Sequence, residues 1–243
     1  MSTILSVHAL SKRFGGLTAL SDVSFEVGEG AIVGVMGANG AGKTTLFSLI
    51  AGNSRPSSGD IRYQGRSVVG LRPDQICRRG IARTFQIVKP FPALTVLENL
   101  RTAAMFGKAQ YRRADEADKA SRQVLAEVGL DDVANQAAST LTLSGQKRLE
   151  IARAIATGAR LIMLDEVMAG LTPTEVAQML QTLRAIQAAR GLTLLVIEHV
   201  MRALMDLCSH ILVLHLGELI AQGTPQEIGR DRRVLAVYLG APA

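Results

Sequence analysis

The stretch GANGAGKTT carries the strongest chemical signal in the chain, because its spacing matches the phosphate-binding pattern G-x-x-x-x-G-K-[ST]. Glycines let the backbone curl until its N–H groups point at phosphate oxygens. We expect Lys43 to bring a positive charge to the terminal phosphates and Thr44 to bring its hydroxyl to Mg²⁺. A glycine-rich turn without a ligand is the weaker interpretation. The residues expected to bind the phosphates are Gly37, Ala38, Asn39, Gly40, Ala41, Gly42, Lys43, Thr44 and Thr45.

A pair of acids, Asp165 and Glu166, ends the apolar stretch LIMLDE. Ligands in open α/β sheets lie at the carboxyl ends of the strands, and adjacent strand residues point to opposite sides. The two carboxylates therefore take different roles. Asp165 suits the ligand shell of Mg²⁺, and Glu166 suits polarising a water that attacks phosphate. The pair could also simply begin a loop, but a phosphate loop in the same chain favours catalysis.

Continuously apolar runs predict the strands that position these residues, as in sheets covered on both faces. Helical stretches alternate with them, and one of these, TTLFSLIAG, opens directly from the phosphate loop. This alternation predicts an α/β fold with a mainly parallel central sheet. The expected strands cover residues 31–36, 161–164 and 192–197.

The strand signal disappears between about residues 91 and 155, so we expect an inserted α-helical subdomain, 91–155, within a single domain of residues 1–243. Thr95 followed by Glu98 predicts a capping box at the first helix, which makes Glu98 structural rather than catalytic. The expected helices cover residues 95–106, 117–130 and 146–156.

Composition narrows the class of protein. The chain has 243 residues, of which 48% are hydrophobic and 20% charged, as in ordinary globular proteins. We expect a cytosolic protein, because we find neither a spanning apolar run nor a signal peptide. The net charge of +6 comes from short, scattered basic clusters. The first interpretation of these clusters is a solvated face of the protein, the second is attraction to an anionic membrane surface, and nucleic-acid binding comes last. Cys77 and Cys208 have no metal-ligand spacing and predict reduced, structural thiols.

These motifs together resemble the nucleotide-binding subunits of ABC transporters, from about Ile4 to Gly240. The resemblance implies a P-loop NTPase core, an N-terminal antiparallel β portion and the inserted helical subdomain. It also implies that the chain binds ATP and Mg²⁺ and hydrolyses the ATP.

Three further residues match places in the motifs of that family. Phe14, in SKRFGGLTAL, has the place of the aromatic that stacks on adenine; its alternative is an exposed ring packed on the sheet. Gln86, in RTFQ, matches a glutamine that contacts Mg²⁺ or the attacking water and moves with the membrane partner; its alternative is a surface amide. His199, in VIEHV, matches the γ-phosphate histidine. The other histidines have no such context and are expected to be ordinary strand residues: His8, His210 and His215.

Several stretches narrow the resemblance to the ATPases of branched-chain amino-acid importers, or relatives that take up amides, urea or other amino-acid-like solutes. They are KRFGGLTALSDVSFEV, GIARTFQIVKPFPALTVLENL, LEIARA, LDEVMAGLTPTEV, VIEHVM and VYLG. The resemblance implies transmembrane permease subunits, a second ATPase subunit and, indirectly, a periplasmic solute-binding protein as partners, with no nucleic acid. It also implies a peripheral location at the cytoplasmic face of the inner membrane. The solute is selected by the partners.

The chain departs from the family's pattern at three places. Val167 replaces a common Pro, Thr172 replaces Asp or Asn, and LTLSGQKRLE (141–150) replaces the L-S-G-G-Q-like signature, which contacts the γ-phosphate bound by the other subunit. Two alignments of the signature compete. The gapless one puts Ser144 in place of the second glycine. In the other, the residues from Leu143 to Gln146 form a signature that is one residue shorter. We favour the gapless one, because a deletion rotates the helix start by about 100° relative to its buried face.

The interpretation that explains most motifs is an ATP-hydrolysing subunit of a membrane importer, in a heterodimer whose other subunit carries an intact signature. The damaged signature supports an alternative, a nucleotide-dependent binding or regulatory module with weak hydrolysis. A soluble repair or translation ATPase is a weaker third possibility, because one short domain lacks the expected tandem or coiled-coil additions.

Overall fold

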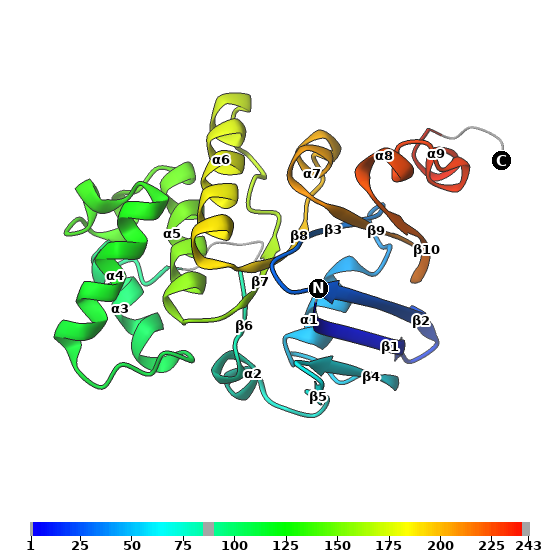
Figure 1. The fold of residues 1–243 in the computed structure, drawn as a ribbon, viewed down its shortest axis with the longest axis horizontal. Helices are drawn as coiled ribbons and strands as arrows, with labels where there is room; N and C mark the ends of the chain where they lie inside the picture. The colour runs from blue at the N-terminus through cyan, green and yellow to red at the C-terminus, as the bar shows by residue number, and fades with distance from the viewer. Residues whose placement is uncertain (1, 85–89, 240–243) are drawn as a thin grey trace. The chain divides into compact units, whose positions relative to one another are not determined.

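The computed structural model describes residues 2–84 and 90–239, which fall into two compact units (Figure 1). The first unit joins Met1–Pro73 to Thr193–Ala243, and the second covers Asp74–Leu192. From the sequence we expected one domain with an insertion at 91–155. The second unit contains that stretch and also carries strands and helices on both sides of it along the chain.

An antiparallel sheet opens the first unit, with the strand order β2-β1-β4-β5. Side chains of β2 alternate between exposed and buried from Asp22 onward, as in a sheet with one face on the core. The four strands are β1 (Thr3–Phe14), β2 (Leu17–Gly28), β4 (Ser58–Tyr63) and β5 (Arg66–Ser67).

The first unit also contains parallel strands, with β3 between β8 and β9. The antiparallel strand β10 pairs with β9. Every residue of β3 and β8 is buried, which explains their continuous apolar sequences. These strands are β3 (Ile32–Met36), β8 (Thr193–Ile197), β9 (His210–His215) and β10 (Glu218–Gly223).

Helix α1 (Lys43–Ile50) follows β3 and buries Leu46, Phe47 and Ile50 completely. Three further helices complete the described part of this unit: α7 (Met201–Leu207), α8 (Pro225–Ile228) and α9 (Arg232–Leu239).

The second unit contains the parallel pair β6 (Ile81–Arg83) and β7 (Leu161–Asp165). Its helices α3, α4 and α5 pack against one another (Figure 1). The helices, including two short 3₁₀ turns, are α2 (Pro73–Arg79), α3 (Val96–Phe106), α4 (Ala114–Val128), η1 (Asp131–Val133), η2 (Ala138–Thr140), α5 (Leu143–Ala156) and α6 (Pro173–Arg190).

The structure confirms the predicted fold class and the three predicted strands, which are β3, β7 and β8. It also confirms the capping box at α3, where the Thr95 hydroxyl accepts a hydrogen bond from the Glu98 backbone and the Glu98 carboxylate accepts one from the Thr95 backbone. Among the residues that the structure describes, no helix is long and apolar enough to cross a membrane.

Candidate functional site

The phosphate loop joins the carboxyl end of β3 to the start of α1, as its motif requires. A Cβ on Gly37 would lie 2.5 Å from the carbonyl oxygen of Leu214. A Cβ on Gly42 would lie 2.7 Å from the carbonyl oxygen of Ala19, and Gly42 has φ +103°. Only glycine fits these two positions, so the curl of the loop depends on both. Ala38, Asn39 and Gly40 are exposed, which leaves the top of the loop open to a ligand.

Lys43 is buried, with 6% of its surface exposed. Its ammonium donates hydrogen bonds to the carbonyl oxygens of Gly37, at 2.6 Å, and Ala38, at 3.0 Å. The positive charge is therefore held inside the loop, where an anion would meet it together with the N-terminus of α1. Thr44 is exposed and Thr45 partly buried.

The hairpin of β1 and β2 carries Phe14 at its turn, where it pairs with Leu17. The Phe14 ring is 51% exposed, and the Lys12 ammonium lies 4.7 Å from its centroid. A half-exposed ring in β1 fits both interpretations, a ring available for stacking and an exposed ring packed on the sheet. Ala19, on the same hairpin, contacts the phosphate loop at Gly42, as the close approach above shows.

His199 lies two residues after the end of β8, behind Glu198, and is exposed. Because β3 and β8 are parallel neighbours with Val35 opposite Ile197, His199 and the phosphate loop leave the sheet at the same edge. Within the first unit, the structure thus brings His199 and the loop to one end of the strands.

Asp165 ends β7 and is 2% exposed. Arg83, at the end of β6, donates a hydrogen bond from Nη2 to its Oδ2 at 2.8 Å. The Thr84 hydroxyl accepts a hydrogen bond of 2.9 Å from the Asp165 backbone. Neighbouring parallel strands therefore fix both the backbone and the carboxylate of Asp165.

Glu166 follows with an unusual backbone, because its φ is +52° in a residue other than glycine. Such a conformation persists where surrounding groups hold it, and it is common at functional sites. The buried Lys147 of α5 donates a hydrogen bond of 3.0 Å to the Glu166 carbonyl oxygen. The signature helix is thereby connected to the backbone of the expected catalytic base.

Helix α5 begins at Leu143, and the hydroxyl of Thr142 caps it by accepting a hydrogen bond from the Gly145 backbone. Leu149 and Ile151 are buried. Ser144 lies in the first turn of this helix in either alignment of the signature, so the gapless alignment stays a prediction.

The other departures from the family's pattern have structural explanations. Val167 is fully buried, so an apolar side chain suits this position. Thr172 caps α6 in a capping box with Glu175, a role that Asp and Asn also fill. Gln86 lies outside the described residues.

Comparison with known proteins matches residues 20–169 to the ABC transporter family and residues 218–243 to the family described as branched-chain amino acid ATP-binding cassette transporter. The chain is 39% identical to BraF of Pseudomonas aeruginosa, a high-affinity branched-chain amino acid transport ATP-binding protein, over 98% of both chains. This chain belongs to the ABC transporter family. It is one of the family's ATP-binding subunits, which hydrolyse ATP.

Solved structures of ABC ATP-binding cassettes have the same fold. The ADP conformation of MJ1267 matches with a TM-score of 0.90 and 27% identity, and covers 99% of this chain and 100% of its own. A dimeric post-hydrolysis structure of MJ0796 bound to ADP and Pi matches with a TM-score of 0.81 and 25% identity, over 91% of this chain and 99% of its own.

Sequence reasoning missed two side chains of this ABC subunit, Arg83 and Lys147. The only signal for Arg83 was its place as the charged first residue of RTFQ, directly after the apolar Ile81 and Ala82. Lys147 could not be recognised, because its contact depends on how α5 packs beside the loop after β7.

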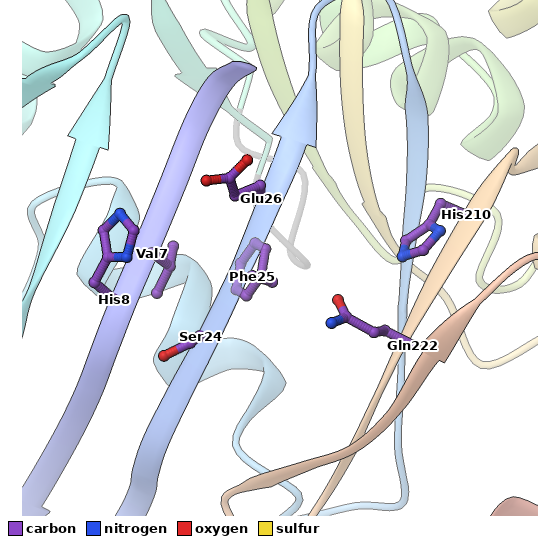
Figure 2. Close-up of a pocket in the computed structure, with 7 residues that line it drawn as sticks. All are labelled: Val7, His8, Ser24, Phe25, Glu26, His210 and Gln222. Atoms are coloured by element: carbon purple, nitrogen blue, oxygen red, sulfur yellow. The ribbon is translucent and has the colours of Figure 1, made fainter. Parts of the chain in front are cut away.

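The first unit also has a hollow that is lined by residues of its strands (Figure 2). It is lined by Val7, His8, Ser24, Phe25, Glu26, His210 and Gln222. His210 pairs with Val33 at the amino end of β3, whereas the phosphate loop follows the carboxyl end. His8, His210 and His215 are strand residues, as predicted. Within residues 2–84 and 90–239, no group of three or more His, Cys, Asp or Glu residues could hold a metal.

Proposed function

We propose that this subunit hydrolyses ATP with Mg²⁺ to drive import of branched-chain amino acids or closely related amino-acid-like solutes. The observation that carries the proposal is the 39% identity to BraF over 98% of both chains. The match of residues 218–243 to the branched-chain amino acid family supports the same solute class.

The phosphate loop, from Gly37 to Thr45, is proposed to bind the phosphates of ATP. Its backbone curl and buried Lys43 suit an anion, and the exposed Phe14 ring suits the face of adenine. His199 is proposed to donate a hydrogen bond to the γ-phosphate.

The oxygens of Thr44 and Asp165 are hard donors of the kind that Mg²⁺ prefers, and Gln86 is proposed as a further ligand of the metal or of the attacking water. No carboxylate-rich cage exists among the described residues, which suits a metal that is held largely by phosphates and water. Bound Mg²⁺ would neutralise negative charge on the phosphates during transfer.

Glu166 is proposed as the general base that accepts a proton from the attacking water. The hydrogen bond from Lys147 to its carbonyl oxygen fixes the backbone from which the carboxylate projects. Glu166 can thus be pre-positioned before the substrate binds.

The proposed partners are transmembrane permease subunits, a periplasmic solute-binding protein that acts through them, and a second ATPase subunit. We propose a heterodimer, because the Ser144 variant of the signature would weaken both sites of a homodimer but one site of a heterodimer. The proposed location is peripheral, at the cytoplasmic face of the inner membrane. The same Ser144 favours the second candidate function, a regulatory nucleotide-binding module with weak hydrolysis.

A comparison of two substitutions tests the chemistry. Glu166→Gln should bind ATP as the wild type does, lose turnover and accumulate an ATP-bound dimer with its partner ATPase. Lys43→Ala should lose tight ATP binding. Glu116→Gln is the matched control, because Glu116 is an exposed acid of α4. Normal turnover in Glu166→Gln would overturn the assignment of the base, and wild-type dimer turnover far below that of other family members would favour the regulatory module.

A further inference from the structure

Arg83 and Asp165 form a buried ion pair in the second unit. The Nη2 to Oδ2 distance is 2.8 Å, and the two side chains are 9% and 3% exposed. The pair follows from strand register, because β6 and β7 run parallel with Arg83 opposite Met163. Asp165 lies two residues beyond Met163, on the same side of the strand.

The Arg83 guanidinium donates a hydrogen bond to one oxygen of the Asp165 carboxylate, which is proposed to be a ligand of Mg²⁺. A buried carboxylate without a nearby cation is costly, so some positive group has to balance Asp165 whether or not a metal is present. A positive charge within hydrogen-bond distance also repels a second cation and lowers the affinity of the carboxylate for it.

We propose that Arg83 is a positioning residue, the resident counter-ion of Asp165, and that it competes with Mg²⁺ for this carboxylate. The proposal rests on the proposed role of Asp165 as a ligand of the metal. Mg²⁺ then binds poorly to the free chain and enters with ATP, whose phosphates supply the additional negative charge.

A purely structural ion pair would have different consequences. Loss of Arg83 would then lower stability equally with and without Mg²⁺ and would leave metal affinity unchanged. Competition predicts instead that loss of the guanidinium tightens Mg²⁺ binding, since the metal replaces the missing counter-ion.

The test is a Mg²⁺ titration of the chain saturated with a non-hydrolysable ATP analogue. Binding is measured by calorimetry and by the shift of the unfolding temperature. Arg83→Met should bind Mg²⁺ about tenfold more tightly than the wild type, because one repelling charge is gone. Arg83→Lys, which retains the charge, should resemble the wild type. Arg101→Met is the matched control, since it breaks the ion pair with Asp118 between α3 and α4. It should leave Mg²⁺ affinity unchanged.

Arg83→Gln replaces Arg83→Met in the test if Arg83→Met fails to fold, because the uncharged glutamine amide can still donate a hydrogen bond to Asp165. Its Mg²⁺ affinity should lie between those of the wild type and Arg83→Met. Unchanged or weaker Mg²⁺ binding in the neutral Arg83 variants would overturn the inference. Asp165→Asn separates the two proposals: if it leaves Mg²⁺ affinity unchanged, the role of Asp165 as a ligand is wrong. If it weakens binding while neutral Arg83 variants do not tighten it, the competition alone is wrong.

Discussion

At the residue scale, the buried Lys147 holds the backbone of Glu166 and links it to helix α5, which its sequence position does not reveal. Its side chain is 4% exposed, and its ammonium holds the carbonyl of Glu166, whose φ of +52° costs about 1–2 kcal/mol in a residue other than glycine. The interaction therefore links the signature helix to the expected base.

Lys147→Met should lower kcat more than it raises KM for ATP. The reason is that Glu166 loses its backbone anchor while the phosphate loop is untouched, and a buried carbonyl left unpaired costs about 1–3 kcal/mol of stability. Steady-state ATPase kinetics of the assembled transporter provide the measurement. Lys147→Arg retains a donor and should recover much of kcat; an increase in KM alone would contradict the assigned role.

Cys208 offers a pH-dependent prediction. Burial raises the pKa of its thiol to about 12. The folded chain keeps this thiol neutral while the unfolded chain ionises it above about pH 8.5, so stability is complete below that pH and falls as the pH rises toward 12. By pH 10.5 the wild type should lose about 1–3 kcal/mol of unfolding free energy relative to Cys208→Ala. Denaturant unfolding at several pH values measures this, and parallel pH curves for the two proteins would refute it.

At the element scale, the first turn of α5 combines a sound cap with a departure from the signature. Thr142 caps the helix, and Ser144 places a Cβ where the family's pattern has glycine. Weakening one charge-assisted N–H contact to phosphate costs about 1.5–3 kcal/mol.

Ser144→Gly should therefore raise turnover at the partner's nucleotide site about tenfold. The price in helix stability is about 0.5–1 kcal/mol, because glycine is a poor helix former. The measurement is the single-turnover rate of ATP hydrolysis by the assembled dimer with Glu166→Gln in this chain, so that only the partner's site contributes. No gain, or a loss, would show that Ser144 is a tolerated variant.

Helix α6 explains why threonine is acceptable at position 172. The hydrogen bond from the Thr172 backbone lowers the pKa of the Glu175 carboxyl, so the capping box stabilises above the ordinary glutamate pKa and weakens as the pH falls through the lowered value. Thr172→Ala should cost about 1 kcal/mol at neutral pH, and Thr172→Asp close to none. Thermal unfolding of the three proteins measures these differences; equal loss in both variants would point to a role other than capping.

At the scale of the whole molecule, the sequence predicted the phosphate loop and the strands because each rests on local patterns. The loop needs glycines at fixed spacing, and β3, β7 and β8 are buried on both faces. The Arg83 and Lys147 contacts depend on strand register and on helix packing, which are set by residues far apart in the chain. The division into two units was also not visible, because one unit is assembled from both ends of the chain.

The central claim is that ATP turnover at Glu166 drives solute import. Its most direct test is ATP-dependent uptake of labelled leucine by proteoliposomes that hold this chain, its permease subunits and its partner ATPase, with the solute-binding protein added. We expect uptake with the wild type and with the Glu116→Gln control, and at least about a hundredfold loss with Glu166→Gln, since general-base catalysis contributes about 10²–10⁴-fold. Undiminished uptake with Glu166→Gln would contradict the account.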